Sequence, residues 1–395
     1  MPTLLQINIT VNWGSTGKIA EHIGRCARVH GWESFIAYGR WGNPSKSHLI
    51  KVGNMVDMYL HYGEQRFRDN EGLCSRGATK RLIRQIEEIR PDVVQLHNIH
   101  DHYLNYRLLY EYLSSTNINV VWTFHDCWAF TGGCAYFDIP LCDKWISLCS
   151  QCPQRKNKID KSSSHFKKRQ ELIASLGKRL TIVPVSAWLE TFCQKSMLRN
   201  CSIRLIHNGI DTEKFKTNGS KNTKPLILGV ALAWTARKGL EDFIRLREVI
   251  SENKADIVLI GLSEQQIKNL PIGIKGLSKT QSLDELVRLY NQASVLVNPT
   301  YADNFPTVNL EALACGTPVV TYRTGGSPEA VDDKTGIVVA KGDINALADS
   351  IMQVLNHPEK YSRENCQGRA EKLFNKDRQF GKYIDLYEEL ISHQE

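Results

Sequence analysis

The sequence contains no apolar run near the roughly 18 residues that a membrane-spanning helix needs. Its N-terminus, Met-Pro-Thr-Leu-Leu-Gln, lacks the basic segment that opens a signal peptide. No tract is low in complexity, and 27 glycines and 13 prolines among 395 residues are too few for collagen-like or disordered classes. We therefore expect a folded protein that stays in the cytoplasm.

The chain has only a small excess of positive charge, with 50 Lys and Arg against 42 Asp and Glu. Much of that excess lies in one basic run, which holds nine cations against Asp160 and Glu171: Arg155, Lys156, Lys158, Lys161, Lys167, Lys168, Arg169, Lys178 and Arg179. A single basic face is therefore expected rather than a surface coated with nucleic acid.

Short apolar runs alternate with helical patterns along most of the chain. The runs predict strands at residues 4–9, 34–38, 92–96, 120–124, 181–185, 226–230, 256–260, 295–298, 319–322 and 336–339. Helical spacing lies between them, at residues 18–29, 79–89, 239–251, 283–292 and 344–355. This alternation is typical of doubly wound parallel sheets and predicts an α/β fold with two Rossmann-like domains.

The seam between the two series lies at residues 212–224, where polar residues and glycine gather without apolar periodicity. We expect an N-terminal domain at 1–211 and a C-terminal domain at 212–376. Residues 377–391 carry an apolar stripe at helical spacing, so the C-terminal segment 377–395 is expected to be a helix that packs back on the N-terminal domain.

The most informative stretch is residues 301–320, which follows a predicted strand. Pro306 suits the start of a helix, and Gly316 suits its end. The N–H groups of such a helix start favour a pyrophosphate. Glu311, one turn beyond Thr307 on the same face, could accept hydrogen bonds from both hydroxyls of a ribose.

In this context the Asp-x7-Glu spacing of Asp303 and Glu311 resembles the Glu-x7-Glu signature of retaining glycosyltransferase family 4. The resemblance extends to Val185-Ser186, the turn at 207–211, Lys238-Gly239 and the loop at 325–329, and it is greatest to the branch that builds bacterial surface polysaccharides. It implies the GT-B fold, with two domains facing across a cleft. It also implies a UDP- or GDP-sugar donor, a saccharide or polyprenyl-linked acceptor, and retention of configuration by front-face attack.

The resemblance also assigns roles to individual residues. It makes Glu311 the ribose ligand, Asp303 the acid near the hydroxyls of the transferred sugar, and Lys238 the pyrophosphate ligand. Arg237 substitutes for an arginine that the family carries at the position of Ala233. The helix start provides the remaining expected donor contacts: Asn304, Phe305, Pro306 and Thr307.

In the N-terminal half, three features lie where predicted strands end or helices begin. His125 ends a strand, and the resemblance makes it a donor-sugar contact near the reacting centre. Gly17 belongs to a glycine-rich turn whose two-residue spacing from Gly14 is not that of a Walker A loop; the resemblance makes it a donor-side backbone contact. His97 and His100 follow another strand and are expected to face the acceptor.

Eleven cysteines, an odd number, argue against a disulfide framework. Four of them form a C-x7-C-x6-C-x2-C pattern: Cys134, Cys142, Cys149 and Cys152. Four thiolates suit tetrahedral structural zinc; buried thiols or an iron–sulfur cluster are the alternatives. Related polysaccharide transferases share such a loop. No Asp-x-Asp occurs in the chain, so no catalytic metal is expected.

The basic run includes a predicted helix near residues 164–176, in which Phe166, Ile173 and Leu176 lie among lysines. A polyprenyl-linked acceptor would be reached at a membrane, so this helix is expected to face the inner leaflet, or else to be solvated. Two other functions share parts of the pattern. A sugar-nucleotide 2-epimerase would use the same fold without an acceptor, and a zinc-containing nucleic-acid-binding module would use the basic run.

Overall fold

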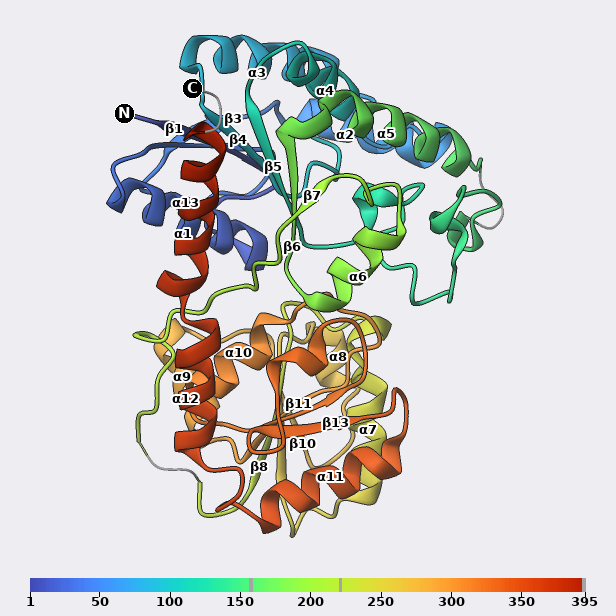
Figure 1. Cartoon of the computed structure of the whole chain (residues 1–395). Helices are drawn as coiled ribbons and strands as arrows, with labels where there is room; N and C mark the ends of the chain where they lie inside the picture. Colours follow the sequence, from blue (N-terminus) through green and yellow to red (C-terminus); the bar gives the residue numbers. More distant parts are fainter. Residues whose placement is uncertain (156–158, 220–221, 393–395) are drawn as a thin grey trace. The chain divides into compact units, whose positions relative to one another are not determined.

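The computed structural model describes residues 1–155, 159–219 and 222–392, and it divides into two compact units (Figure 1). The first unit comprises Met1–His207 and the chain from Asp377 onward, and the second comprises Asn208–Lys376. The first stretch ends at His207 rather than at residue 211. Asn208 already donates from Nδ2 to the carbonyl of Phe305 (3.2 Å), and Ile210 N donates to Phe374 O (2.7 Å), which ties these residues to the second unit.

The first unit contains one seven-stranded sheet in the order β3-β2-β1-β4-β5-β6-β7, with every pair parallel. Its strands are β1 (Thr3–Asn8), β2 (Glu33–Tyr38), β3 (His48–Lys51), β4 (Val93–Leu96), β5 (Asn119–Phe124), β6 (Leu180–Pro184) and β7 (Ser202–Ile203). Its helices are α1 (Gly14–Val29), α2 (Met55–Arg68), α3 (Arg76–Ile89), α4 (Tyr106–Ser114), α5 (Ser162–Leu176), α6 (Ala187–Lys195) and α13 (Lys376–Ser392).

The second unit repeats this plan with a six-stranded sheet in the order β10-β9-β8-β11-β12-β13. Its strands are β8 (Leu226–Val230), β9 (Asp256–Ile260), β10 (Ile274–Leu277), β11 (Val295–Asn298), β12 (Val319–Tyr322) and β13 (Gly336–Val339). Its helices are α7 (Leu240–Val249), α8 (Glu264–Lys268), α9 (Leu283–Gln292), α10 (Thr307–Ala314), α11 (Ile344–Asn356) and α12 (Arg363–Phe374). Two parallel sheets covered by helices are the predicted α/β architecture, which is confirmed.

Parallel pairing brings the carboxyl ends of neighbouring strands to one edge of each sheet. In the first unit, Leu4 pairs with Val93 and Val94 pairs with Val120, so the residues that follow β1, β4 and β5 meet at the same edge. In the second unit the residues after β8, β11 and β12 do likewise. Ligands of open α/β sheets bind at this edge, and each unit carries its polar cluster there.

Helix α13 packs on the first unit, as predicted for the C-terminal segment. Its buried face carries Phe380, Tyr383, Ile384 and Tyr387, which share one core with residues of α1, β4, β5 and β6. Tyr387 donates its hydroxyl to Oε1 of Gln95 on β4. The last segment of the chain therefore completes the core that the first segment begins.

Helix α5 forms as predicted, but the expectation that its apolar side chains face a membrane is wrong. Phe166, Ile173 and Leu176 are at most 4% exposed because α5 packs along α4. Arg169 is buried as well, and its guanidinium lies 3.9 Å from the ring centroid of Trp128. Lys156 and Lys158 of the basic run lie outside the described residues. Among the described residues of the run, Arg169 therefore does not contribute to a basic face.

Candidate functional site

The polar cluster of the second unit lies where β11 ends and α10 begins. The loop between them, residues 299–306, leads to Pro306, which caps α10 without a side-chain hydrogen bond. Gly325 lies against this loop in the left-handed region (φ +52°), and a Cβ there would stand 1.5 Å from the carbonyl oxygen of Asp303. Only glycine permits this approach, which fixes the position of the Asp303 backbone.

Two cations face Asp303 from the turn that precedes α7. Lys238 Nζ lies 2.5 Å from Oδ2 of Asp303, and Arg237 Nη1 lies 3.6 Å from the same oxygen. Arg237 Nη1 also donates to the carbonyl of Ala302 (2.5 Å). Two cations near a helix start need an anion beside them. In this structure Asp303 is that anion, so the structure brings together three residues that the sequence analysis placed near the donor.

Glu311 lies on α10, one turn beyond Thr307, and its Oε2 accepts a hydrogen bond from the hydroxyl of Tyr290 (2.7 Å). Tyr290 comes from α9 and is fully buried; burial and the charge of Glu311 raise its pKa well above the usual value. This bond holds one carboxylate oxygen in a fixed orientation. Sequence analysis missed Tyr290, because nothing in the spacing of residues 290 and 311 indicates that their side chains meet.

Three expected donor contacts are buried in the protein itself. Asn304, Phe305 and Pro306 are buried, and the Phe305 ring lies 5.7 Å from that of Phe374. The Phe305 ring packs within the second unit, and the burial of all three side chains leaves mainly backbone groups for a ligand at the start of α10. Thr307 is half-buried and begins the helix.

In the first unit, the three predicted histidines line one small cavity at the carboxyl edge of the sheet. His97 and His100 follow β4, and His125 and Asp126 follow β5. The structure thus brings together His125, expected near the donor sugar, with His97 and His100, expected near the acceptor.

The hydrogen-bond chain through this cluster fixes the tautomers of two histidines. Gln6 donates from Nε2 to the carbonyl of Ala20, so its Oε1 is an acceptor, and His97 Nε2 must donate a hydrogen bond to it (3.0 Å). His97 Nδ1 then accepts from His125 Nε2 (3.0 Å). Burial lowers the pKa of His97 well below its usual value and that of His125 to about 4, so both rings are neutral. His125 therefore has its proton on Nε2 and a lone pair on Nδ1.

His100, unlike His97 and His125, is positively charged. Burial alone would lower its pKa, but Asp126 Oδ2 lies 2.8 Å from its Nε2 and Asp101 Oδ1 lies 3.4 Å from its Nδ1, and together they raise the pKa well above the usual value. His100 is an imidazolium held between two carboxylates. Sequence analysis did not pair these residues. Gln6 could have been found, because it is a polar residue inside an otherwise apolar buried strand.

Gly17 lies in α1, where neighbouring residues of the protein itself leave no room for a side chain. A Cβ on Gly17 would stand 2.6 Å from Oγ1 of Thr10, and its carbonyl accepts from Asn12 N (3.0 Å). A donor contact through Gly17 remains a prediction.

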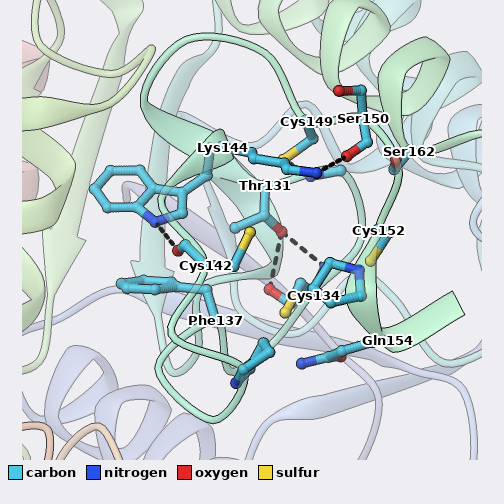
Figure 2. Close-up of a pocket in the computed structure, with 14 residues that line it drawn as sticks. Thr131, Cys134, Phe137, Cys142, Lys144, Cys149, Ser150, Cys152, Gln154 and Ser162 are labelled. Carbon is cyan, nitrogen blue, oxygen red and sulfur yellow. Dashed lines mark hydrogen bonds between the residues drawn. The ribbon is translucent and has the colours of Figure 1, made fainter. Parts of the chain in front are cut away.

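The four clustered cysteines lie in the loop between β5 and α5 and line one cavity, drawn in Figure 2. Within the described parts of the chain, no three His, Cys, Asp or Glu side chains are placed as a ready metal site. Zinc binding by these cysteines stays a prediction.

The architecture defines the class of protein first. Sucrose-phosphate synthase from Thermosynechococcus elongatus matches over all of both chains with a TM-score of 0.73 at 16% identity. Anabaena HepE, solved in complex with UDP-glucose, covers 97% of this chain and 99% of its own with a TM-score of 0.63 at 15% identity. The two-unit fold is that of the GT-B glycosyltransferases.

Sequence comparison then identifies the family. The model described as Glycosyltransferase Family 4 matches residues 17–214, and the model described as Glycosyl transferases group 1 matches residues 224–357. The chain belongs to glycosyltransferase family 4. WcaC of Escherichia coli K12, whose name assigns it to colanic acid biosynthesis as a glycosyl transferase, is 25% identical over 374 residues, covering 87% of this chain and 89% of WcaC.

Proposed function

We propose that this glycosyltransferase moves a sugar from a nucleoside-diphosphate sugar to a saccharide or lipid-linked acceptor in bacterial surface polysaccharide synthesis, with retention of configuration. The observation that carries the proposal is the cluster of Arg237, Lys238, Asp303 and Glu311 around the start of α10. UDP-glucose bound to HepE and the name of WcaC support the donor class and the pathway class.

In the proposed reaction, the bond between the anomeric carbon and the departing phosphate oxygen breaks while the acceptor oxygen bonds to the same face of that carbon. The acceptor proton passes to the departing phosphate oxygen. Negative charge grows on the diphosphate, where Arg237, Lys238 and the N–H groups at the start of α10 can stabilise it. Lys238 must then exchange its bond to Asp303 for a phosphate oxygen, which leaves the carboxylate to accept hydrogen bonds from sugar hydroxyls.

Titration calorimetry of Glu311 variants with UDP and with GDP tests the donor site. Each charge-assisted hydrogen bond to a ribose hydroxyl contributes about 1.5 to 3 kcal/mol, so Glu311→Gln should weaken binding of the preferred nucleotide by one to two orders of magnitude. Glu248→Gln, which changes an exposed acid near the end of α7 in the same unit, is the matched control and should bind as the parent does. Unchanged nucleotide binding by Glu311→Gln would refute the assignment.

We also propose that the enzyme binds the surface of an anionic membrane peripherally, through helix α2. No helix in the described residues is long and apolar enough to cross a bilayer. Helix α2 instead turns its apolar side chains outward: Met55, Val56, Tyr59, Leu60 and Phe67 are each 58–74% exposed. At 100° per residue these five positions share one face of the helix. Such a surface favours burial against another apolar phase.

The charges around this face favour anionic lipid over a neutral protein partner. Arg66 lies within the apolar face, and α3 carries an exposed row at Arg76, Lys80 and Arg84, spaced one helical turn apart. Arg81 Nη2 of α3 lies 3.7 Å from Asp57 Oδ2 of α2, so the two helices are neighbours. Basic residues near an anionic leaflet contribute on the order of 1 kcal/mol each.

Vesicle flotation tests this surface. The parent should float with vesicles containing phosphatidylglycerol but not with pure phosphatidylcholine, and Leu60→Gln with Phe67→Gln should abolish flotation. Lys167→Gln with Lys168→Gln, on the solvent side of α5, should leave it unchanged. Failure of the parent to float would overturn the proposal. So would a dimer seen by light scattering that the α2 variant dissociates, because a second copy would then cover this face.

A further inference from the structure

The loop between β5 and α5 is long and has little regular structure of its own. It runs from His125 to Lys161, and its described part contains three single turns of 3-10 helix, η1 (Trp128–Phe130), η2 (Lys144–Ile146) and η3 (Pro153–Arg155). Loops beyond about 15 residues without secondary structure are uncommon in compact domains and need another source of order. Part of that order is apolar, because Phe137 and Trp145 pack on Phe192 of α6.

The four cysteines of this loop line its remaining feature, one small cavity. Their side chains approach the cavity from different sides (Figure 2). The residues are up to 18 positions apart in sequence, and the loop brings all four around one space. The buried cysteines elsewhere in the chain, such as Cys193 and Cys366, lie outside this cavity. Clustering of this kind is a property of the loop rather than of cysteine burial in general.

We propose that Cys134, Cys142, Cys149 and Cys152 bind one structural zinc ion. Four thiolates are the ligand set of a closed tetrahedral zinc site, with zinc–sulfur bonds of about 2.3 Å. The structure describes no disulfide bond among the chain's cysteines. In the described structure the four sulfur atoms are not all within bonding distance of one point, so zinc binding would require the loop to move its cysteines closer together.

The surroundings of the cavity suit the charge of such a site. A zinc ion with four thiolates carries a net charge of −2. Lys144 lines the cavity, where its Nζ donates to the carbonyls of Ser150 and Gln151 (3.0 and 3.1 Å). The guanidinium groups of Arg155 and Arg169 flank Gly133, the neighbour of Cys134. Lys144 at the cavity and Arg169, whose charge acts on Cys149, therefore favour the thiolates, whereas Arg155 is paired with Asp69 and Asp160.

One backbone donor is already directed at a ligand sulfur. The N–H of Gly132 donates to Cys149 Sγ at 3.2 Å. Hydrogen bonds to the ligating atoms orient metal ligands and are a regular part of metal sites. A side chain on Gly132 would collide with the Ser162 carbonyl and Cys149 Cβ, at 2.6 and 2.8 Å, so glycine is required for this approach.

The proposed ion would order the loop that supports the histidine cluster. Trp128 packs on His100 with ring centroids 5.2 Å apart, and Arg169 holds the same loop by donating to the carbonyls of Trp128 (2.6 Å) and Thr131. Thr131 in turn accepts from Cys134 N through its Oγ1 (2.8 Å). Zinc therefore fixes the wall of the His100 cavity without touching a substrate.

Metal analysis of protein purified without added metal or chelator tests the proposal directly. Elemental mass spectrometry should give about one zinc per chain in the parent. The double variant Cys149→Ser with Cys152→Ser should contain less than a tenth of that amount. Cys74→Ser with Cys201→Ser removes two cysteines outside the loop and should keep one zinc. Replacement by cobalt should produce the visible absorption of a tetrahedral thiolate site.

Each other outcome overturns the proposal and identifies what the cysteines do instead. Protein without metal whose four thiols react with maleimide contains plain thiols. A mass about 4 Da below that of the reduced chain indicates two disulfides. Iron with broad visible absorption indicates an iron–sulfur cluster. Because the parent's metal content is decisive by itself, the test stands even where the double variant does not fold, and it is independent of the donor assignment.

Discussion

Neutralising Asp303 should strengthen the binding of free nucleoside diphosphate while weakening that of the intact sugar nucleotide. Asp303 is the carboxylate that Lys238 and Arg237 now face, at 2.5 and 3.6 Å. Asp303→Asn keeps the shape of the side chain but removes its charge. It frees Lys238 for phosphate and removes repulsion between the carboxylate and the diphosphate.

The magnitude follows from two opposing terms. At an effective dielectric constant of about 20, a unit charge about 6 Å from a phosphate oxygen costs roughly 3 kcal/mol. Loss of the bond that holds Lys238 in place offsets part of this, because a charge-assisted hydrogen bond contributes about 1.5 to 3 kcal/mol. These terms leave a gain of up to about 1.4 kcal/mol, so we expect UDP to bind up to about tenfold more tightly. UDP-glucose should lose affinity, because an amide replaces the acceptor of its sugar hydroxyls.

Calorimetric titration of UDP and UDP-glucose against the same preparations measures both changes. Asp256→Asn is the matched control, because Asp256 pairs with Lys224 at the same distance of 2.5 Å on the surface of the same unit. It should change neither constant. The gain for UDP should shrink at high salt, since screening weakens charge interactions. Weaker UDP binding by Asp303→Asn, or equal changes for both ligands, would refute the reasoning.

Three further predictions follow from the packing. Burial lowers the pKa of His61, His125 and His165 to about 4; as the pH falls from 6.5 to 4 the unfolded chain takes up these protons first. Each histidine should therefore lower the free energy of unfolding by about 1.4 kcal/mol for each unit that the pH falls in this range, as measured by urea denaturation at pH 7 and 5. The dependence on pH should be shallower in His125→Gln. Gly325→Ala must move the Asp303 carbonyl and should lower the free energy of unfolding by about 1 to 3 kcal/mol in the same assay. Deleting α13 should leave the first unit unfolded and the second resistant to protease; a fully resistant truncated chain would contradict the shared core.

The strands of the second unit were the most predictable part of the fold. The predicted bounds of β8, β9, β11, β12 and β13 are those observed, because each of them is a short apolar run bounded by polar residues. The edge strands β3, β7 and β10 were missed. They are partly exposed and contain polar residues such as His48 and Lys275, so no apolar run marks them.

Two helices show what periodicity leaves undetermined. The apolar stripe on α5 was predicted, but the spacing of apolar residues does not distinguish a stripe that packs on protein from one that faces a membrane. In the structure the stripe packs on α4. Helix α2 was not predicted. Its most apolar residues lie on the exposed face while His61 is buried, which inverts the pattern that a core helix gives.

The candidate site was predictable where one segment carries it and unpredictable where topology assembles it. Asp303, Thr307 and Glu311 lie in one loop and helix, so their relation follows from spacing. The bond between Lys238 and Asp303 joins residues 65 positions apart, and the resemblance to a family placed both near the donor without predicting that they pair. The contacts of Tyr290 with Glu311 and of His100 with Asp126 depend on which strands and helices become neighbours.

The position of α13 bears on how the protein is made. The first unit begins at the N-terminus but takes its last core helix from the C-terminus, whereas the second unit is one continuous stretch. During synthesis the N-terminal segment therefore emerges from the ribosome hundreds of residues before the helix that covers its core. The sequence of the second unit is complete before α13 is translated. The core of the first unit therefore stays uncovered until α13 has been made, and it is the part of the chain that would engage chaperones during synthesis.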